Sequence, residues 1–528
     1  MEMEKKLLQR REIVEFFLKK NLLLSSDVVD LFAKEDLEAT YKRIMDNIKS
    51  QEILVLNKDL NDAIGKLAQI DINWLDLEKA RALLEKGKNA KAYQRFMSFI
   101  YSQQAERKEE KSPVKVLFSY EEDSKKRDVQ DFVQYFNVRY NYLANILRNR
   151  SELSNPTSIS RVINKEDKES LCIIGMVKDK QTTKNKNLIL ELEDPTGSIK
   201  VLVNKNRPDL FKKAETIVLD EVIGVVGVNG RNIVFANNIV WPDIQEKELK
   251  KSEDEVYAVF LSDLHVGSKN FLPEAFNKFL NWINQELGND SQREIAKKVG
   301  YVFIVGDLVD GCGIYPEQDR ELEIKDIYQQ YEACARLLSQ IPRKIPIIIC
   351  PGNHDAMRIA EPQPRLYRDL AKPIYDLQNV VSVSNPSLVN IHSSENFNGF
   401  DVLLYHGYSF DYFVANVDSI RNKGGYNRAD LIMRFLLKRR HLAPTHTSTL
   451  YIPDTKQDPL LIKKVPDFFV TGHIHKSVAT NYKNITLISG SCWQSKTLFQ
   501  EKVGHDPEPG RVPVVNLKTR EIKILKFI

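Results

Sequence analysis

Five short polar motifs in the C-terminal half of the chain bring carboxylate, imidazole and amide side chains into a fixed order. Oxygen and nitrogen donors in this mixture suit Mn, Fe or Zn better than a thiolate site or an all-oxygen Mg or Ca cage would. Five of the nine histidines of the chain lie in these motifs. The motifs are Asp263-Leu264-His265, Gly306-Asp307-Leu308-Val309-Asp310, Gly352-Asn353-His354-Asp355, His406-Gly407 and Gly472-His473-Ile474-His475.

The chemistry that such a set can perform is hydrolysis of a phosphate ester. A phosphodiester requires a water made nucleophilic near neutral pH and a clamp for the charge on the phosphorus oxygens. Two metal ions about 3.5–4 Å apart provide both. A carboxylate must bridge the ions, and Asp307 is the best candidate because it lies centrally among the motifs. We therefore expect a two-metal phosphoesterase with two divalent ions, Mn²⁺ first and Fe, Zn or Mg as alternatives.

The elements that would position these residues are strands, because each motif directly follows an apolar run with the pattern of a buried strand. The carboxyl ends of the strands of an open α/β sheet are where such folds bind their ligands. The five motifs can therefore converge on one edge. The runs are residues 256–261, 301–305, 345–350, 402–405 and 468–471.

Taken singly, the motifs have structural explanations. A lone D-x-H or G-D-x-x-D after a strand is usually a set of polar loop residues or helix caps. Five motifs in order, each behind a strand-like run, are hard to produce by chance. A degenerate relic without metal is the more serious alternative, and it is disfavoured because no expected ligand has been replaced.

Together the motifs resemble those of the calcineurin-like metallophosphoesterases, including the double-strand-break repair nuclease of that family. The chain is more similar still to the small subunits of the archaeal D-family DNA polymerases, strongly so over residues 155–528. The resemblance implies an α/β fold, in which a two-sheet sandwich flanked by helices follows an OB-like β-barrel and an N-terminal helical domain. Beside the motifs, it is carried by residues 261–268, 437–444, 465–468 and 491–494.

The resemblance also implies a role for each motif residue. Seven of them would be metal ligands, three on each ion and one carboxylate between the ions. They are Asp263, His265 and His475 on one ion, Asn353, His406 and His473 on the other, and Asp307 as the bridge.

Two further motif residues would act in catalysis without binding metal. His354 matches the non-ligand histidine of the family, which would stabilise charge on the phosphorus oxygens and protonate the leaving 3′-oxygen. Asp310 matches the carboxylate that orients this histidine and raises its basicity. A helix N-cap stays an alternative for Asp310, and Asp355 would either support a neighbouring ligand or cap a turn.

The function implied by the resemblance is that of a proofreading 3′→5′ exonuclease subunit of a heteromeric replicative DNA polymerase, acting on single-stranded or mismatched ends. Its partners would be the large catalytic subunit, single-stranded or primer-template DNA and, through the complex, the sliding clamp. Two alternatives stay open. A free-standing metallophosphodiesterase leaves the N-terminal parts unexplained, and a non-catalytic assembly subunit leaves the intact site residues unexplained.

Composition fits a cytoplasmic, globular protein of two to four domains. The 528 residues are 42% apolar and 28% charged, and the chain is too long for one hydrophobic core. Lys plus Arg exceeds Asp plus Glu by only 77 − 72 = 5, so any basic nucleic-acid footprint must be local. The five cysteines lack CxxC spacing, and the charged first residues exclude a secretory signal. No membrane association is expected.

The pattern along the chain predicts four regions. They are an N-terminal helical interaction region (1–104), a linker and connecting helix (105–154), the OB-like domain (155–245) and the metallophosphoesterase domain (255–528).

Finer features are expected within these regions. A helix should begin at Ser25-Ser26-Asp27, more helix should cover residues 98–103, and residues 105–115 should form a hinge. The helix expected at 128–149 carries an aromatic stripe that favours a core or interface over base stacking.

The OB-like region is expected to be a scaffold. Five strand-like runs at 171–177, 188–192, 199–203, 218–226 and 232–235 predict a small barrel. Barrels that bind single strands usually carry exposed aromatic residues on those strands, and here such residues are sparse.

The insert between His406 and Gly472 is long for one connection between a strand and the next. Tyr408 follows the His406 motif, and a basic helix comes later. A solvated charged face is the ordinary explanation of such a helix. The functional alternative is a DNA channel, in which an aromatic ring meets the terminal base and cations meet phosphates. Its candidate residues are Tyr408, Arg434, Lys438, Arg439 and Arg440.

Overall fold

The computed structural model describes most of the chain beyond residue 113 and parts of the first 56 residues. The chain divides into two compact units, residues 1–112 and 113–528. The helix expected at 98–103 and most of the hinge expected at 105–115 lie outside the described residues. The described residues are 2–20, 22–33, 36–38, 40–41, 55–56, 114–121, 126–163, 168–497, 500–501 and 505–528.

In the described part of the first unit, helices α1 and α2 pack around a small apolar core. The expected helix start at Ser25-Ser26-Asp27 is confirmed, because α2 begins at Ser26. Ile13, Phe17 and Phe32 are among the buried residues that hold the helices together. The elements are α1 (Glu2–Lys19), α2 (Ser26–Phe32) and the parallel pair of β1 (Leu23–Leu24) and β2 (Val55–Leu56).

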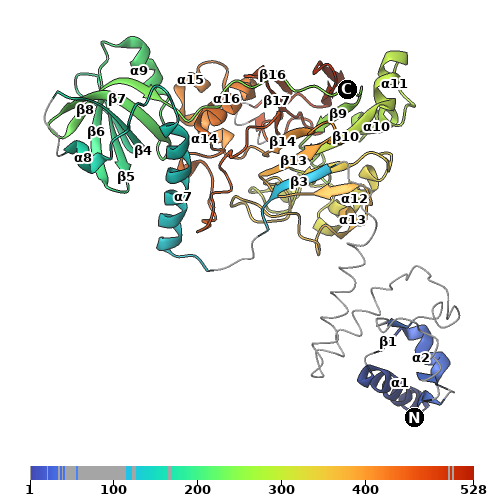
Figure 1. Ribbon diagram of the computed structural model, residues 1–528. Coiled ribbons are helices and arrows are strands. Elements are labelled where there is room, and N and C mark those ends of the chain that lie inside the picture. The colour runs from blue at the N-terminus through green and yellow to red at the C-terminus, as the bar shows by residue number, and fades with distance from the viewer. Residues whose placement is uncertain are drawn as a thin grey trace. The chain divides into compact units, whose positions relative to one another are not determined.

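The second unit contains two six-stranded mixed sheets (Figure 1). The first has the order β12-β11-β10-β9-β18-β19, and β9 to β12 run parallel. The second has the order β16-β17-β15-β14-β13-β3, and β14, β15 and β17 run parallel. The bounds in the first sheet are β9 (Tyr257–Leu261), β10 (Val299–Val305), β11 (Ile347–Cys350), β12 (Val380–Ser382), β18 (Arg511–Asn516) and β19 (Ile522–Lys526). Those in the second are β3 (Val114–Ser119), β13 (Ser387–Ile391), β14 (Phe400–Leu404), β15 (Phe468–Thr471), β16 (Val478–Tyr482) and β17 (Ile485–Ser489).

The two sheets share one hydrophobic core, because successive side chains of a strand point to opposite faces. In β10, Phe303 and Val305 point into the core between the sheets, whereas Val302 and Ile304 pack beneath helices. Burial on both faces explains why the central strands are continuously apolar rather than alternating. The predicted α/β class is confirmed.

Helices cover the outer faces of both sheets. Buried residues of α10, α11 and α12 join the core on the outer face of the first sheet, and those of α14 and α16 join the core on the second. The bounds are α10 (Pro273–Ile283), α11 (Asp290–Lys297), α12 (Ile327–Leu338), α13 (Lys372–Tyr375), α14 (Phe410–Asn416), α15 (Asp418–Arg421) and α16 (Ala429–Arg439), with the 3₁₀ turns η1 (Gln318–Arg320), η2 (Gly425–Arg428) and η3 (His446–Ser448).

The prediction that the hinge extends to residue 115 is wrong. Val114 and Lys115 belong to β3, which pairs antiparallel with β13 at the edge of the second sheet. Val114 is buried in the core between the sheets. The error arose because the preceding charged run and Pro113 look like a linker, whereas the strand itself is short and lies at an edge.

Five strands that lie between β3 and β9 in the chain close into a barrel in the order β4-β5-β6-β8-β7. The run expected at 218–226 begins later, at Val222, because Asp220 takes a left-handed backbone conformation (φ 63°) in the preceding turn. The barrel elements are β4 (Ser170–Thr182), β5 (Leu188–Asp194), β6 (Gly197–Val203), β7 (Val222–Gly230) and β8 (Ile233–Val240), with α8 (Ile159–Ile163) and α9 (Pro208–Glu215).

The expected connecting helix is α7 (Val129–Arg148), which runs beside the barrel (Figure 1). Asp128 caps it, because its carboxylate accepts a hydrogen bond from the backbone N–H of Asp131. Its aromatic stripe is structural, as expected: Tyr135 packs with the insert of the second sheet and Tyr140 with the barrel wall.

A buried polar network fastens α7 to the insert. Asp458 accepts hydrogen bonds from the Tyr135 hydroxyl (2.7 Å), Arg139 Nε (2.7 Å) and His441 Nε2 (2.8 Å). The backbone N–H of Ala443 donates to His441 Nδ1 (3.0 Å), so the imidazole is neutral with its proton on Nε2. Burial and the nearby Arg139 charge lower the pKa of His441 to about 4.

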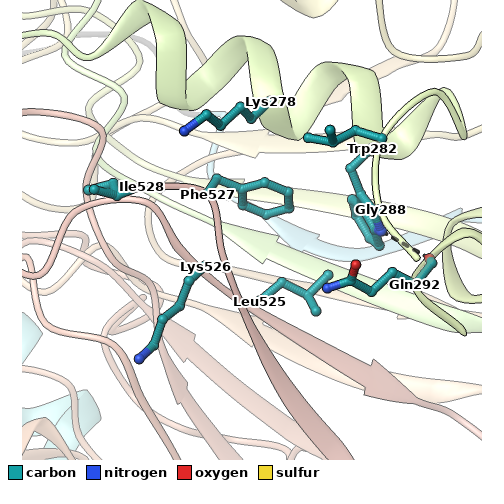
Figure 2. A pocket seen from close by; sticks show the side chains of 9 residues that line it. Lys278, Trp282, Gly288, Gln292, Leu525, Lys526, Phe527 and Ile528 are labelled. Atoms are coloured by element: carbon teal, nitrogen blue, oxygen red, sulfur yellow. Dashed lines mark hydrogen bonds between the residues drawn. The ribbon is translucent and has the colours of Figure 1, made fainter.

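A small surface pocket of about 170 Å³ lies between α10 and the C-terminal strand β19 (Figure 2). Trp282 and Phe527 line it, and Lys278 and Lys526 stand at its edge. It shares no residue with the five motifs. Within the described residues, no helix is long and apolar enough to cross a membrane.

The buried His441 gives a testable dependence of stability on pH. Between pH 6.5 and 4 the unfolded chain binds a proton that folded His441 does not, so stability falls as the pH falls. Relative to His441→Gln, the wild-type free energy of unfolding should drop by about 2 kcal/mol between pH 7 and pH 5. Urea titrations of both proteins at both pH values measure this difference. An unchanged difference would mean that His441 is not held neutral.

Candidate metal centre

The five motifs meet where strands of both sheets end. Asp263 and His265 follow β9, Asp307 follows β10 and Asn353 follows β11, all in the first sheet. The second sheet contributes the remaining three predicted ligands. His406 follows β14, and His473 and His475 follow β15.

Two buried carboxylates form the centre of the cluster. Asp263 is fully buried and Asp307 is 1% exposed. Asp307 Oδ2 lies 3.2 Å from His406 Nε2 and 3.8 Å from His265 Nε2. Asp263 Oδ1 lies 3.4 Å from His475 Nε2. Asp263, His265 and His475 thus form one group with metal-ligand spacing, and Asp263, Asp307 and His406 form another.

Partners outside the cluster determine which ring nitrogen each histidine offers. A carbonyl or carboxylate oxygen can only accept, so the nitrogen that it contacts carries the hydrogen. The Val305 carbonyl lies 2.9 Å from His406 Nδ1, and the Asp310 carboxylate lies 3.0 Å from His265 Nδ1. Both histidines therefore turn Nε2 toward the centre.

His475 and Asn353 complete the approach of donors. His475 Nδ1 accepts a hydrogen bond from the Gln500 side-chain N–H at 2.8 Å, so His475 Nε2 carries the hydrogen that points to His265 Nε2, 3.1 Å away. Asn353 Oδ1 lies 3.1 Å from His406 Nε2. The amide oxygen therefore faces the same space as the imidazoles.

His473 is held at Nε2 rather than at Nδ1. Its Nε2 lies 3.0 Å from Asp411 Oδ2, so Nε2 carries the hydrogen and Nδ1 is the nitrogen with a lone pair. The backbone N–H of His473 donates to both oxygens of Asp263, at 3.1 and 3.0 Å. The orientation of His473 thus depends on a residue of the insert.

The backbone at the cluster is strained. Asp263, His265, Asp307, His473 and His475 all adopt positive φ angles, between 51° and 71°. Residues with a side chain rarely take this conformation, and such outliers gather at functional sites.

Two glycines make room for the donors. A Cβ on Gly306 (φ 83°) would lie 2.1 Å from His406 Nδ1, and one on Gly352 would lie 2.2 Å from Asp307 Oδ1. Glycine is required at both positions because the motif residues approach the backbone so closely.

Charges in the cluster compensate one another. Burial opposes ionisation of Asp307, but His406 and His354 outweigh it and hold the pKa of Asp307 well below its usual range. Burial likewise opposes a charged His406, yet Asp307 raises the pKa of His406 to about 10. Each buried charge is therefore held by an opposite charge beside it, and a bound cation could take the place of the protons that do this here.

The Asp310 carboxylate does not orient His354, which corrects the expectation from sequence. Asp310 Oδ1 contacts His265 Nδ1 at 3.0 Å but lies 4.0 Å from His354 Nδ1. His354 Nδ1 instead donates to the backbone carbonyl of Asp310, at 2.9 Å. Burial lowers the pKa of His354 overall, although Asp307 and Asp310 both act to raise it, as expected for Asp310. Its Nε2 remains available to a substrate.

Asp355 holds the turn that carries Asn353 and His354. Its Oδ2 accepts hydrogen bonds from the backbone N–H of Gly352 (2.9 Å) and of Leu308 (3.4 Å). Burial and the neighbouring Asp307 raise the pKa of Asp355 to about 7. Of the two alternatives left by the sequence, this geometry favours the cap.

Known proteins similar to this chain identify its family. A family model for the alpha/epsilon B-type subunits of DNA polymerases matches residues 258–480. The DNA polymerase II small subunit of Methanothermobacter thermautotrophicus is 43% identical over 403 residues, which cover 76% of this chain and 80% of that protein. The chain belongs to the DNA polymerase II small subunit family. The Pyrococcus furiosus small subunit is 40% identical, and its match covers 76% of this chain and 64% of that protein.

The barrel has its own match. A model described as OB-fold nucleic acid binding domain covers residues 171–232, so the predicted OB-like barrel is confirmed. An archaeal phosphodiesterase of known structure aligns with 51% of this chain at 12% identity and a TM-score of 0.25, too weak a likeness to bear on the fold.

Three residues near the centre of this member of the small subunit family were missed in the sequence. Gln318 and Gln494 both donate to the Asp310 carboxylate, at 3.0 and 3.2 Å, and Asp411 contacts His473. Gln494 lies in the family segment 491–494, so a signal for it existed. Asp411 stands among aromatic residues in the insert, where nothing in the sequence distinguishes it from a surface carboxylate.

Tyr408 lies beside the cluster, as the predicted DNA contact requires. Its ring centroid is 5.8 Å from that of His473. The basic helix α16 does not fit that prediction. Arg439 is 2% exposed and forms an ion pair with Glu221 of the barrel, and Arg440 is 7% exposed and donates to the carbonyls of Ile462 and Lys463.

The other two cations of α16 also face the protein. Lys438 lies 3.7 Å from the centre of the Trp241 ring, which belongs to the chain just beyond the barrel. Arg434 donates to Thr480 Oγ1 at 3.3 Å and is 3.5 Å from Asp430. The prediction that Arg439 and Arg440 contact DNA is therefore wrong. Helix α16 instead packs the two-sheet region against the barrel, through Arg439 on Glu221 and Lys438 on Trp241.

This contact yields a prediction about stability. Burial lowers the pKa of Arg439 to about 10 and raises that of Glu221, so each charge is tolerated only because of the other. Arg439→Ala should lower the free energy of unfolding by about 3–5 kcal/mol, because it leaves a buried charge unpaired. Arg439→Met combined with Glu221→Leu should recover most of the loss in thermal melts.

The more exposed Arg434→Ala serves as the control and should melt close to wild type. An Arg439→Ala protein that melts like wild type but binds DNA more weakly would restore the DNA-contact hypothesis.

Proposed function

We propose that this chain is the proofreading 3′→5′ exonuclease subunit of a heteromeric replicative DNA polymerase, hydrolysing single-stranded or mismatched 3′ ends with two divalent ions. The observation that carries the proposal is that five side chains, from strand ends of both sheets, converge with metal-ligand spacing. They are Asp263, His265, Asp307, His406 and His475, and Asn353 contacts His406 beside them. In this proposal the two sheets and their helices form a calcineurin-like metallophosphoesterase sandwich.

The donor set fits two divalent ions. His265 and His475 turn Nε2 atoms toward each other at 3.1 Å, and two buried carboxylates lie within the same space. Lone pairs and anionic oxygens at such separations repel unless a cation or protons lie between them. The mixture of imidazole, carboxylate and amide favours Mn²⁺, with Fe, Zn or Mg as alternatives.

Seven residues would hold the ions, as the family resemblance implies. When bound, the ions would make a water nucleophilic and neutralise charge on the phosphorus oxygens. One ion would have Asp263, His265 and His475, the other would have Asn353, His406 and His473, and Asp307 would lie between them.

His354 would act on the leaving group. The Asp310 carbonyl fixes its Nδ1 hydrogen, so Nε2 is the nitrogen that would face the leaving 3′-oxygen. Nε2 could protonate that oxygen from the imidazolium form, which the negative charge of a bound phosphate would favour. Its side chain is 19% exposed, whereas those of His265 and His406 are nearly inaccessible. His354 can therefore reach a substrate that the ligand histidines cannot touch. Tyr408 would stack on the terminal base from the His473 side.

The proposed setting is the polymerase complex. Relatives named DNA polymerase II small subunit support a large catalytic subunit as partner. The OB-fold match leaves the barrel as scaffold or DNA contact. The ion pair of barrel residue Glu221 with Arg439 supports the scaffold role, because α16 covers that side of the barrel and would block DNA there. Primer-template DNA would arrive through the large subunit, and the sliding clamp would be reached through the complex.

Three functions can be separated by one set of assays. The chain, alone and with its large subunit, is given 3′-mismatched primers, matched primers and p-nitrophenyl phosphate with Mn²⁺. A proofreading exonuclease shortens the mismatched primer fastest, a free-standing phosphodiesterase prefers the small ester, and an assembly subunit cleaves neither. Asp307→Ala is the inactive control, because no neighbouring carboxylate replaces its position between His406 and His265.

Catalysis and metal binding should separate at two histidines. His354→Ala removes a proton donor but no proposed ligand, so cleavage should slow by about 10²–10⁴ while two Mn²⁺ stay bound. His406→Ala should lose bound metal as well, because Nε2 faces Asp307 and Asn353.

Metal content per chain and single-turnover cleavage, measured on both variants, test this difference. Loss of metal from His354→Ala, or full activity in it, would contradict the assigned role.

A further inference from the structure

Asp411 differs from the seven proposed ligands, because it contacts one of them, His473, from the insert rather than following a strand end. It lies on the first turn of α14, five residues after His406. Its carboxylate contacts His473 Nε2 at 3.0 Å, and its side chain is about half exposed (48%). The insert thus reaches a proposed ligand through a carboxylate.

The contact fixes one imidazole and leaves the others alone. His265 is held by Asp310 and His406 by the Val305 carbonyl, so neither depends on Asp411. With Nε2–H donated to Asp411, His473 can offer only Nδ1 to a metal. Without that carboxylate, the ring could turn or shift its hydrogen to Nδ1.

Asp411 is itself held by the insert. The Tyr426 side chain, from the turn η2, lies near the Asp411 carboxylate. The Tyr426 ring lies against His505, with 3.9 Å between ring centroids. The carboxylate therefore has a neighbour in the turn η2, which contains no proposed ligand, and outer partners of metal-binding histidines are usually supported in this way.

We infer that Asp411 is a positioning residue that orients His473 toward one of the two ions, so that the insert sets the affinity of that ion alone. The inference rests on the proposed two-metal site and deepens it. Partners of this kind contribute about 10- to 100-fold to metal affinity. The ion assigned to Asp263, His265 and His475 should be unaffected, because the side-chain contacts described for these three residues do not include Asp411.

The test is a titration of the full chain with Mn²⁺, followed by the EPR signal of free ion, which gives two binding constants. Asp411→Ala should weaken one Mn²⁺ by about 10- to 100-fold and leave the other unchanged. Asp411→Asn keeps an oxygen that can accept from His473 Nε2–H, so it should restore most of the affinity. Asp418→Asn is the matched control, because this exposed carboxylate of the same insert forms its ion pair with Arg421.

The outcomes are distinct. Unchanged constants in Asp411→Ala, or equal weakening of both ions, would overturn the inference. If Asp411→Ala also melts at a lower temperature, Asp411→Asn decides the matter. Failure of Asp411→Asn to regain Mn²⁺ affinity would then overturn the inference as well. A wild-type chain that binds two Mn²⁺ but does not shorten DNA would refute the proposed exonuclease and leave the positioning role of Asp411 intact.

Discussion

Two buried carboxylates impose the constraint on which the rest of the structure depends. Asp263 and Asp307 have almost no exposed surface, and the charge of each opposes ionisation of the other. Anions can be buried together only where opposite charge or hydrogen-bond donors surround them. Here the surrounding imidazoles come from both sheets, so the sheets must bring their strand ends to one place. The same crowding accounts for the positive φ angles of the motif residues and for the glycines at positions 306 and 352.

Orientation of the imidazoles is a second requirement, and the chain meets it with residues far from the motifs in sequence. His265 depends on Asp310, which is itself held by Gln318 and Gln494. His406 depends on a strand carbonyl of the opposite sheet, at Val305. Each ring is thereby committed to one tautomer, and the nitrogen left over faces the cluster. A metal would therefore meet rings that already face it, and at His406 it would take the place of a proton.

The sequence predicts those features of the site that depend on residues close together in the chain. Strand-like runs followed by polar motifs locate the donors correctly, because a buried strand has a recognisable pattern and its end has a fixed neighbour along the chain. Contacts across the fold have no such pattern. The Asp310 carboxylate was expected to serve His354 and contacts His265 instead, a choice set by which side of the β10 turn faces which ring. Asp411 carried no signal at all, since its role arises only when α14 folds back over His473. The edge strand β3 was missed for the same reason, because its partner β13 is more than 260 residues away.

The basic helix illustrates why charge in a sequence is weak evidence for nucleic-acid binding. Most residues of α16 are buried, so its cations reach the interior as well as the surface. Arg439 and Arg440 are used on a barrel carboxylate and on backbone carbonyls, which leaves little of this helix for phosphates. Affinity for DNA grows with the number of phosphates neutralised, and with an excess of only 5 basic residues over the whole chain the cations that do this must be grouped locally, outside Arg439 and Arg440. Under the proposed function, the large subunit would share in holding the primer-template. This chain would hold only the end of the strand that enters the metal centre, which matches a site built to act on termini.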